Sequence, residues 1–306
     1  MIKNPGPGIS GSGGHIESSS GIQISYDNNA VITGNTFDTP GAVDEIDNDE
    51  ECIATQHDAG TGEPFHDTGT LTSATATIIT DTAKSWSGSA TSWASSDSGT
   101  YSVTPYLLLI TGAGTGEYAL ISSHTTDTLT LSTPLTTVPS AGDHYVIVVP
   151  SSLDQTITNN TIVGARIGIE LYAGAIGDIV SNNTLVNAGA IYLRGLDTAT
   201  DSEHDVCWGN TVAYNSISNP NSEVQSWLAV CGSEYQSTAF GNMLRSNTIA
   251  GNGAAFAPGG CLYTFSPTGD YAQPIDGIFD GIDENPSFSA SHSTFVTATN
   301  ADSGQE

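Results

Sequence analysis

Short stretches of alternating apolar and polar residues, separated by asparagine and glycine, run along most of this chain. In residues 21–37, two such stretches flank Asp27-Asn28-Asn29 and end in an asparagine, a threonine and an apolar residue. The complete set of this closing phrase is Asn35-Thr36-Phe37, Asn160-Thr161-Ile162, Asn183-Thr184-Leu185, Asn215-Ser216-Ile217 and Asn247-Thr248-Ile249. Alternation over such short runs, with Asn and Gly between them, predicts short β-strands joined by tight bends.

The phrase returns at a regular spacing. Its last four copies begin at positions 160, 183, 215 and 247, so they lie 23, 32 and 32 residues apart. The last two copies are preceded by related tripeptides, Trp208-Gly209-Asn210 and Phe240-Gly241-Asn242, again 32 residues apart. A period in the range of about 20–50 residues predicts stacked supersecondary units, each packing on its neighbours, rather than one globular core.

Together these phrases resemble the right-handed parallel β-helix of the pectin-lyase-like superfamily, over residues 21–56 and 150–290. The resemblance implies an all-β solenoid whose coils stack about 4.8 Å apart. An asparagine at the same bend of each coil then forms a hydrogen-bonded ladder that satisfies side-chain amides and backbone together. Ile167–Leu171 and Ala190–Arg194 are expected to be matching strands of successive coils, with Ile167 beside Ile191.

The asparagine phrase is absent from residues 57–150, where hairpin-like spacing predicts an inserted small antiparallel β-barrel or sandwich. The run Gly112–Glu117 and the following Thr128-Leu129-Thr130-Leu131 resemble a small β-module common in phage tail and baseplate-associated proteins. We expect residues 69–150 to be separable from the coils. The predicted organisation is an entry segment (1–20), first β-helix coils (21–56), the inserted module (57–150), the main β-helix (151–270) and a C-terminal cap or tail (271–306).

The charge is strongly one-sided, with 33 acidic against five basic residues and a net charge of −28. Such a polyanion repels nucleic acid and anionic membranes, so both are excluded as partners. The scarcity of lysine is typical of proteins from saline or marine settings, where salt screens self-repulsion; acidic extracellular β-proteins without halophily are the alternative. No apolar run approaches the roughly 18 residues of a membrane span. The first residues lack the apolar stretch of a signal peptide, as expected for a virion protein released by lysis or for a chain whose signal was removed.

One local constellation suggests chemistry. In the expected register Glu170 falls beside Arg194, and a loop rich in carboxylates follows, with Asp197, Asp201, Glu203 and His204. A pair of carboxyl groups flanking a glycosidic bond is the equipment of a glycosidase, so these residues are the catalytic candidates. The alternative is a cross-coil ion pair followed by a solvated or calcium-binding turn. The complete signatures of polygalacturonases and mannuronan epimerases are absent, and no motif indicates an organic cofactor.

Carboxylates and aromatic residues supply two further sets of candidates. Alternating oxygen ligands can hold Ca²⁺, although the run at 44–51 lacks the full EF-hand pattern and is explained better by a solvated acidic loop. The candidate metal ligands are Asp44, Asp47, Asp49, Asp197, Asp201 and Asp205. Exposed aromatic rings can stack on sugar rings, and the candidate glycan-binding residues are Tyr172, Tyr192, Trp227 and Tyr235. Trp208 matches Phe240 in the repeat and is expected in the core instead.

The leading interpretation is a glycan-binding or structural β-helix protein at an extracellular or virion surface, such as a homotrimeric tailspike or tail-fibre component of a virus from a saline environment. The first alternative is a secreted polysaccharide lyase or glycoside hydrolase that works in a groove on the β-helix. The second alternative is a passive cell-surface or matrix protein. All three classes make a polysaccharide, a cell-surface glycan or neighbouring structural proteins the expected partners.

Overall fold

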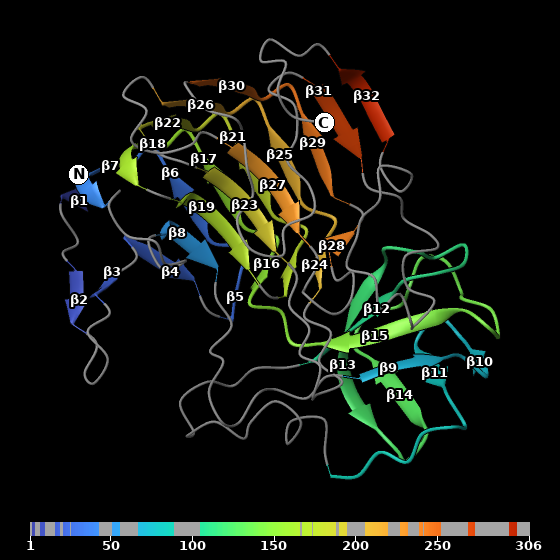
Figure 1. Cartoon of the computed structure of the whole chain (residues 1–306). Helices are drawn as coiled ribbons and strands as arrows, with labels where there is room; N and C mark the ends of the chain where they lie inside the picture. The colour runs from blue at the N-terminus through green and yellow to red at the C-terminus, as the bar shows by residue number, and fades with distance from the viewer. Residues whose placement is uncertain are drawn as a thin grey trace.

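The computed structural model is built from β-strands, and no helix occurs among the residues that it describes (Figure 1). These residues are 2–3, 7–9, 16–18, 21–24, 26–42, 51–55, 67–88, 105–165, 167–172, 174–187, 190–194, 206–219, 227–231, 239–240, 242–251, 269–272 and 294–298. Most strands belong to four sheets, named A, C, D and E, in which the coil strands pair in parallel. The chain visits sheets C, D, E and A in turn and then returns to sheet C, so the arrangement is β-helix-like.

The members of each sheet come from successive passes of the chain. Sheet C contains β4 (Ile22–Ile24), β8 (Glu51–Thr55), β19 (Ile167–Tyr172), β23 (Ala190–Arg194) and β27 (Trp227–Cys231). Sheet D contains β5 (Asp27–Asn28), β16 (Ser152–Leu153), β20 (Ala175–Ile176), β24 (Cys207–Trp208) and β28 (Ala239–Phe240). Sheet E contains β6 (Val31–Thr33), β17 (Thr156–Thr158), β21 (Ile179–Ser181), β25 (Thr211–Ala213) and β29 (Met243–Arg245). Sheet A contains β7 (Thr36–Ala42), β18 (Thr161–Ala165), β22 (Thr184–Val186), β26 (Ser216–Asn219) and β30 (Thr248–Gly251).

Further strands extend the two ends of the stack, where parallel sheets would otherwise present unpaired edges. β1 (Ile2–Lys3) adds to β7 at one end of sheet A. At the other end, β31 (Gly269–Ala272) pairs antiparallel with β29, and β32 (Thr294–Ala298) pairs with β31 (Figure 1). A separate hairpin joins β2 (Pro7–Ile9) to β3 (Ile16–Ser18).

The bends between sheets E and A carry the predicted asparagine ladder. The backbone N–H and the side-chain amide of Asn160 both donate to Oδ1 of Asn183, at 2.9 and 3.0 Å. Asn183 donates in the same way to Asn215, and Asn215 donates to Asn247. Asn35 continues the ladder below Asn160. The ladder predicted from the repeat is therefore confirmed, and it gives buried amides the partners that burial requires.

The ladder is possible because each bend reverses through a left-handed residue. The residue before each ladder asparagine has a positive φ, and these residues are Gly34, Asn159, Asn182, Tyr214 and Ser246. Glycine and asparagine adopt this conformation readily, whereas a tyrosine there is strained by the contact of Cβ with the carbonyl oxygen. The sequence preference for Asn and Gly at the corners thus has a direct backbone cause.

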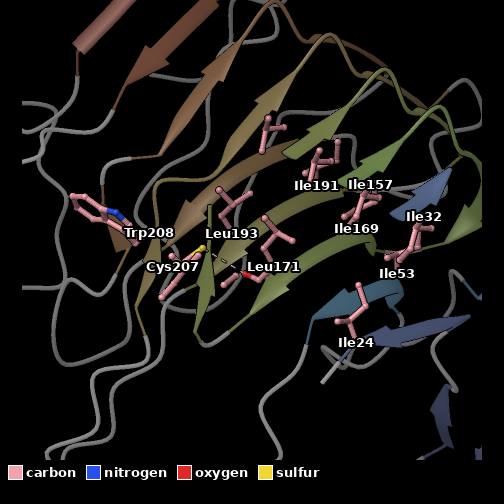
Figure 2. Packing of buried hydrophobic residues seen from close by; sticks show 14 of the residues in the cluster. Ile24, Ile32, Ile53, Ile157, Ile169, Leu171, Ile191, Leu193, Cys207 and Trp208 are labelled. Carbon is pink, nitrogen blue, oxygen red and sulfur yellow. Dashed lines mark hydrogen bonds between the residues drawn. The ribbon is translucent and has the colours of Figure 1, made fainter. Parts of the chain in front are cut away.

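Apolar side chains from the four sheets stack inside the coils. Ile53, Ile169 and Ile191 follow one another along sheet C, and Leu171 and Leu193 form the neighbouring row (Figure 2). All five side chains are fully buried. Trp208 also belongs to this cluster, as its match to Phe240 predicted. Stacking like on like at each coil keeps the core narrow, which explains how a chain with few aromatic residues fills it.

An antiparallel sheet lies between β8 and β16 in the chain. Its strand order is β10 (Ser73–Ala74), β11 (Ile78–Thr80), β14 (Thr128–Leu131), β13 (Tyr118–His124), β12 (Tyr106–Leu109), β15 (His144–Val148) and β9 (Asp67–Thr70). One set of its side chains, including Leu107 and Ile147, forms a cluster of its own. The alternating set, including Leu108 and Val148, belongs to the cluster inside the coils. This shared core argues against the expectation that residues 69–150 are separable.

Candidate functional site

The connections between strands differ sharply in length from corner to corner. Between sheets D and E, and between sheets E and A, every pass uses two residues, such as 177–178 and 182–183. The connections into and out of sheet C vary instead. Those entering it from sheet A are 43–50, 166, 187–189 and 220–226, and those leaving it toward sheet D are 25–26, 56–151, 173–174, 195–206 and 232–238. The unequal repeat spacings arise mainly from these connections, with small differences in the lengths of the strands in sheets A and C.

All long connections between successive coil strands, from β4 to β30, therefore border one sheet. Because residues in loops tolerate variation while a rigid scaffold positions them, binding and catalytic residues concentrate on such segments. The outer face of sheet C, between its two variable edges, is the candidate functional site. In the chain, the predicted metal ligands Asp44 and Asp49 fall in the connection that enters β8, and the acidic segment 197–205 falls in the connection that leaves β23.

The outer face of sheet C is defined by alternation with the core. Ile169 and Leu171 point into the coils, so the intervening Glu170 lies on the opposite face. Glu170 pairs in register with Ala54 on one side and with Tyr192 on the other. Glu170 is only 4% exposed and Tyr192 only 3% exposed, so both outward positions are shielded from water.

The observed register differs from the expected one by two residues. Ile169, not Ile167, is opposite Ile191, and Arg194 is opposite Tyr172 rather than Glu170. The predicted side-by-side pair of Glu170 and Arg194 is therefore wrong. A two-residue slip leaves the same side chains on the same face, which is why the apolar pattern alone did not exclude it.

Three neighbouring strands nevertheless bring several predicted site residues together. Glu170 and Tyr172 lie on β19, Tyr192 and Arg194 on β23, and Trp227 on β27. Tyr172 is half-buried at the end of β19.

Two hydroxyl groups fix the backbone of Tyr172. Its N–H donates to Oγ1 of Thr55 at 2.9 Å, and its carbonyl accepts a hydrogen bond from Oγ of Ser151 at 2.9 Å. These bonds tie the last residue of β19 to β8 and to the segment before β16. Its ring thus leaves the sheet from a fixed backbone position at the border of the outer face.

The remaining predicted site residues lie outside the described part of the chain. They are Asp44, Asp47, Asp49, Asp197, Asp201, Glu203, His204, Asp205 and Tyr235. Among the described residues, no group of histidine, cysteine, aspartate and glutamate side chains is arranged to hold a metal ion. In the same part of the chain, no helix has the length and apolarity needed to cross a membrane.

Sequence reasoning missed a second buried polar column, at the bends between sheets D and E. The backbone N–H of Asp178 donates to Oδ1 of Asn210, and that of Asn210 donates to Oδ1 of Asn242. Gln155 N–H donates in turn to Oδ1 of Asp178 at 2.8 Å. The signal was present, because Ile176-Gly177-Asp178 lies 32 residues before Trp208-Gly209-Asn210. The change from Asn to Asp hid the match.

Asp178 is fully buried, and burial raises the pKa of its carboxyl group to about 7. The nearby charge of Asp154 acts in the same direction, whereas the hydrogen bonds from Ser152 and Gln155 lower the pKa. Tyr118 of the antiparallel sheet donates to Oδ1 of Asp154 at 2.8 Å, so this column touches the contact between the two parts of the core.

Comparisons with known proteins give little beyond the fold. No protein-family model and no curated protein matches the sequence. A solved structure that resembles the chain is that of the tailspike protein gp49 from Pseudomonas phage LKA1, at 14% identity and a TM-score of 0.29. The likeness covers 76% of this chain and 38% of the tailspike, so the chain spans well under half of that protein's length.

Proposed function

We propose that this chain is a tailspike-like or tail-fibre-like β-helix protein that binds a glycan at the border of the outer face of sheet C, beside Tyr172. One observation carries the proposal, namely that every long connection of the coils borders this sheet. A polysaccharide is an extended ligand, and a border that runs along several stacked coils offers it a long, regular surface.

The residue types at this face suit a sugar polymer. Tyr172 lies half-buried at the edge of the face with a fixed backbone, and aromatic rings stack on the apolar side of sugar rings. Carboxylates in 43–50 and 195–206 are acceptors for sugar hydroxyl groups. The net charge of −28 favours a neutral glycan over a uronate polymer, because like charges repel.

Several finer features belong to the same proposal. We infer a right-handed helix of the pectin-lyase-like type, with residues 57–150 as an inserted module of the kind found in phage tails. The coil order, the asparagine ladders and the separate antiparallel sheet support this assignment. The proposal also includes a homotrimer on a virion surface, a saline habitat and Ca²⁺ bound by the acidic connections. The net charge supports the saline habitat, and the carboxylate spacing supports Ca²⁺ binding.

A glycan array on the purified protein tests the binding proposal. Tyr172→Ala should weaken binding to the recognised glycan at least tenfold while the melting temperature changes little. Tyr214→Ala is the matched control, because Tyr214 is an exposed tyrosine at the bend between sheets E and A, away from sheet C. Equal loss of binding in both variants, or no glycan bound by the native protein, would contradict the binding proposal and favour a passive structural role.

Hydrolysis or lysis of the bound glycan is the second candidate function. It is favoured by the placement of Glu170, a carboxyl group shielded from water on the outer face of sheet C. A carboxyl group is one of the side chains that serve as general acid or base in glycan cleavage. Release of oligosaccharides by the native protein, lost in Glu170→Gln with glycan binding retained, would establish catalysis. Absence of any release from a glycan that the protein binds would restrict the function to binding.

A further inference from the structure

The column at the bends between sheets D and E contains one residue that differs chemically from its neighbours. Asn210 uses its side-chain Nδ2 to donate to the Ala175 carbonyl at 3.0 Å and to Oδ1 of Asn242 at 2.9 Å. Asp178 occupies the same position one coil earlier. Its backbone N–H donates to Oδ1 of Asn210, just as the backbone N–H of Asn210 donates to Oδ1 of Asn242. An ionised carboxyl group, however, has no hydrogen to donate.

A second difference in sequence accompanies the first. Ser152 is the register partner of Ala175, so a hydroxyl group stands one coil below Asp178 where a methyl group stands below Asn210. Oγ of Ser152 donates to Oδ2 of Asp178 at 2.5 Å, and Gln155 N–H donates to Oδ1 at 2.8 Å. Asn210 with Ala175 and Asp178 with Ser152 are therefore two solutions for the same corner, one amide-based and one carboxyl-based.

The surroundings of Asp178 disfavour a negative charge. The side chain is fully buried, and although Ser152 and Gln155 donate hydrogen bonds to its oxygens, both donors are neutral and leave the charge of an ionised carboxylate unbalanced. The titratable groups that face it are Asp154 from the adjoining bend and Tyr118 from β13. Asp27 of β5 lies one coil further, where its carbonyl accepts from Nε2 of Gln155. Among these described neighbours, none is a cation.

We propose that Asp178 is a proton-operated element of the coil stack, which holds the corner tight when protonated and loosens it when ionised. In the neutral state its carboxyl O–H takes the place of the amide N–H that Asn210 supplies in the next coil. Ionisation removes that donor and puts a second negative charge beside Asp154. Because Asp154 accepts from Tyr118, the same event weakens the attachment of the antiparallel sheet to the coils.

The direction of the pH effect follows from linkage. The pKa of Asp178 is raised from an unfolded value of 3.8 to about 7 in the folded chain. The stability gained by holding the proton is complete below about pH 4, declines through the interval, and is lost above about pH 7. Within that interval, the unfolding constant should increase by up to about tenfold per pH unit because of this one group.

The test compares the native protein with the double variant S152A/D178N, which installs the Ala175 and Asn210 pair of the next coil. Melting temperatures are measured from about pH 5 to about pH 9 at fixed salt. We expect the native protein to lose stability relative to the variant up to about pH 7 and the two curves to run parallel above it. Parallel curves throughout would overturn the proposal.

A measurement on the unaltered protein keeps the proposal testable if the variant does not fold. Carboxyl ¹³C NMR should show one aspartate that titrates near neutral pH, and exchange of the Gln155 amide hydrogen should accelerate across the same range. That amide is diagnostic because it donates directly to Asp178. Titration of every aspartate at ordinary acidic pH, with no change at Gln155, would also refute the mechanism.

Discussion

Replacing Asn183 by alanine tests whether the asparagine ladder holds the coils together. Asn183 is 1% exposed and lies in the middle of the ladder. Its Oδ1 accepts from the N–H and the side-chain amide of Asn160, and its Nδ2 donates to the Ile157 carbonyl and to Asn215. The substitution removes all four hydrogen bonds at once, because both ends of the amide are used.

The expected cost follows from what remains behind. The buried Asn160 N–H loses its acceptor, and the buried Ile157 carbonyl loses the amide that donates to it. A buried polar group without a partner costs about 1–3 kcal/mol, so two such groups give about 2–6 kcal/mol of lost stability. That is a large part of the total stability of a typical domain.

Asn35→Ala is the matched control, because Asn35 is the partly exposed end of the same ladder. Its backbone N–H keeps its bond to Oδ1 of Asn160, and only bonds donated by its own amide are lost. We expect this change to cost about 0.5–1.5 kcal/mol. Chemical denaturation followed by circular dichroism gives both values from the midpoints at constant slope. If Asn183→Ala costs no more than Asn35→Ala, the ladder does not stabilise the stack.

Three further predictions concern the bends, the antiparallel sheet and the charge. Tyr214→Asn should raise stability by about 1 kcal/mol in thermal unfolding, because Tyr214 has a φ of 58°, which strains a residue other than glycine or asparagine. An unchanged or lower melting temperature would show that contacts of the tyrosine ring outweigh the strain. Deleting residues 69–150 with a short Gly/Ser bridge should lower the melting temperature, because Leu108 and Val148 belong to the core of the coils; a deletion variant as stable as the native chain would show that the coils do not need these side chains. Molar NaCl should raise the melting temperature strongly over dilute buffer, because the Debye length falls from about 30 Å to about 3 Å and salt then screens the net charge of −28. A full gain from millimolar Ca²⁺ alone would locate the effect at specific carboxylates. No gain from either would contradict the proposed saline origin.

The features that repeat were predictable from the sequence, because the same physical requirement recurs at every coil. A buried side-chain amide at a bend needs a hydrogen-bond partner, and the same bend of the next coil supplies one. The side chains of Asn160, Asn183 and Asn215 are therefore aligned from coil to coil. The second column was only half visible. The repeated pairs Gly209-Asn210 and Gly241-Asn242 indicate it. At the same corner of the preceding coil, Asp178 bonded to Ser152 replaces the asparagine, so a search for identical residues does not find this member.

The register of sheet C was not predictable in the same way. Both the expected and the observed pairing keep Ile169 and Ile191 inside and Glu170 outside, so the apolar pattern is blind to the difference. From the paired positions Ile162 and Leu185 of sheet A to the paired positions Ile169 and Ile191 of sheet C, the chain takes seven steps in one coil (169−162) and six in the next (191−185). Lengths of this kind obey no periodicity, and the candidate site lies where they vary.

The two kinds of corner explain why the candidate site lies where it does. A corner that carries a ladder cannot change its length, because an added residue would move its amide out of reach of the next coil; the bends 182–183 and 214–215 show this constraint. The corners beside sheet C carry no such ladder among the described residues, and one of them admits the whole of 56–151 between β8 of sheet C and β16 of sheet D. Variation in this chain is therefore free only around sheet C, and a binding surface that must be adapted to a particular ligand can be built there without loosening the stack.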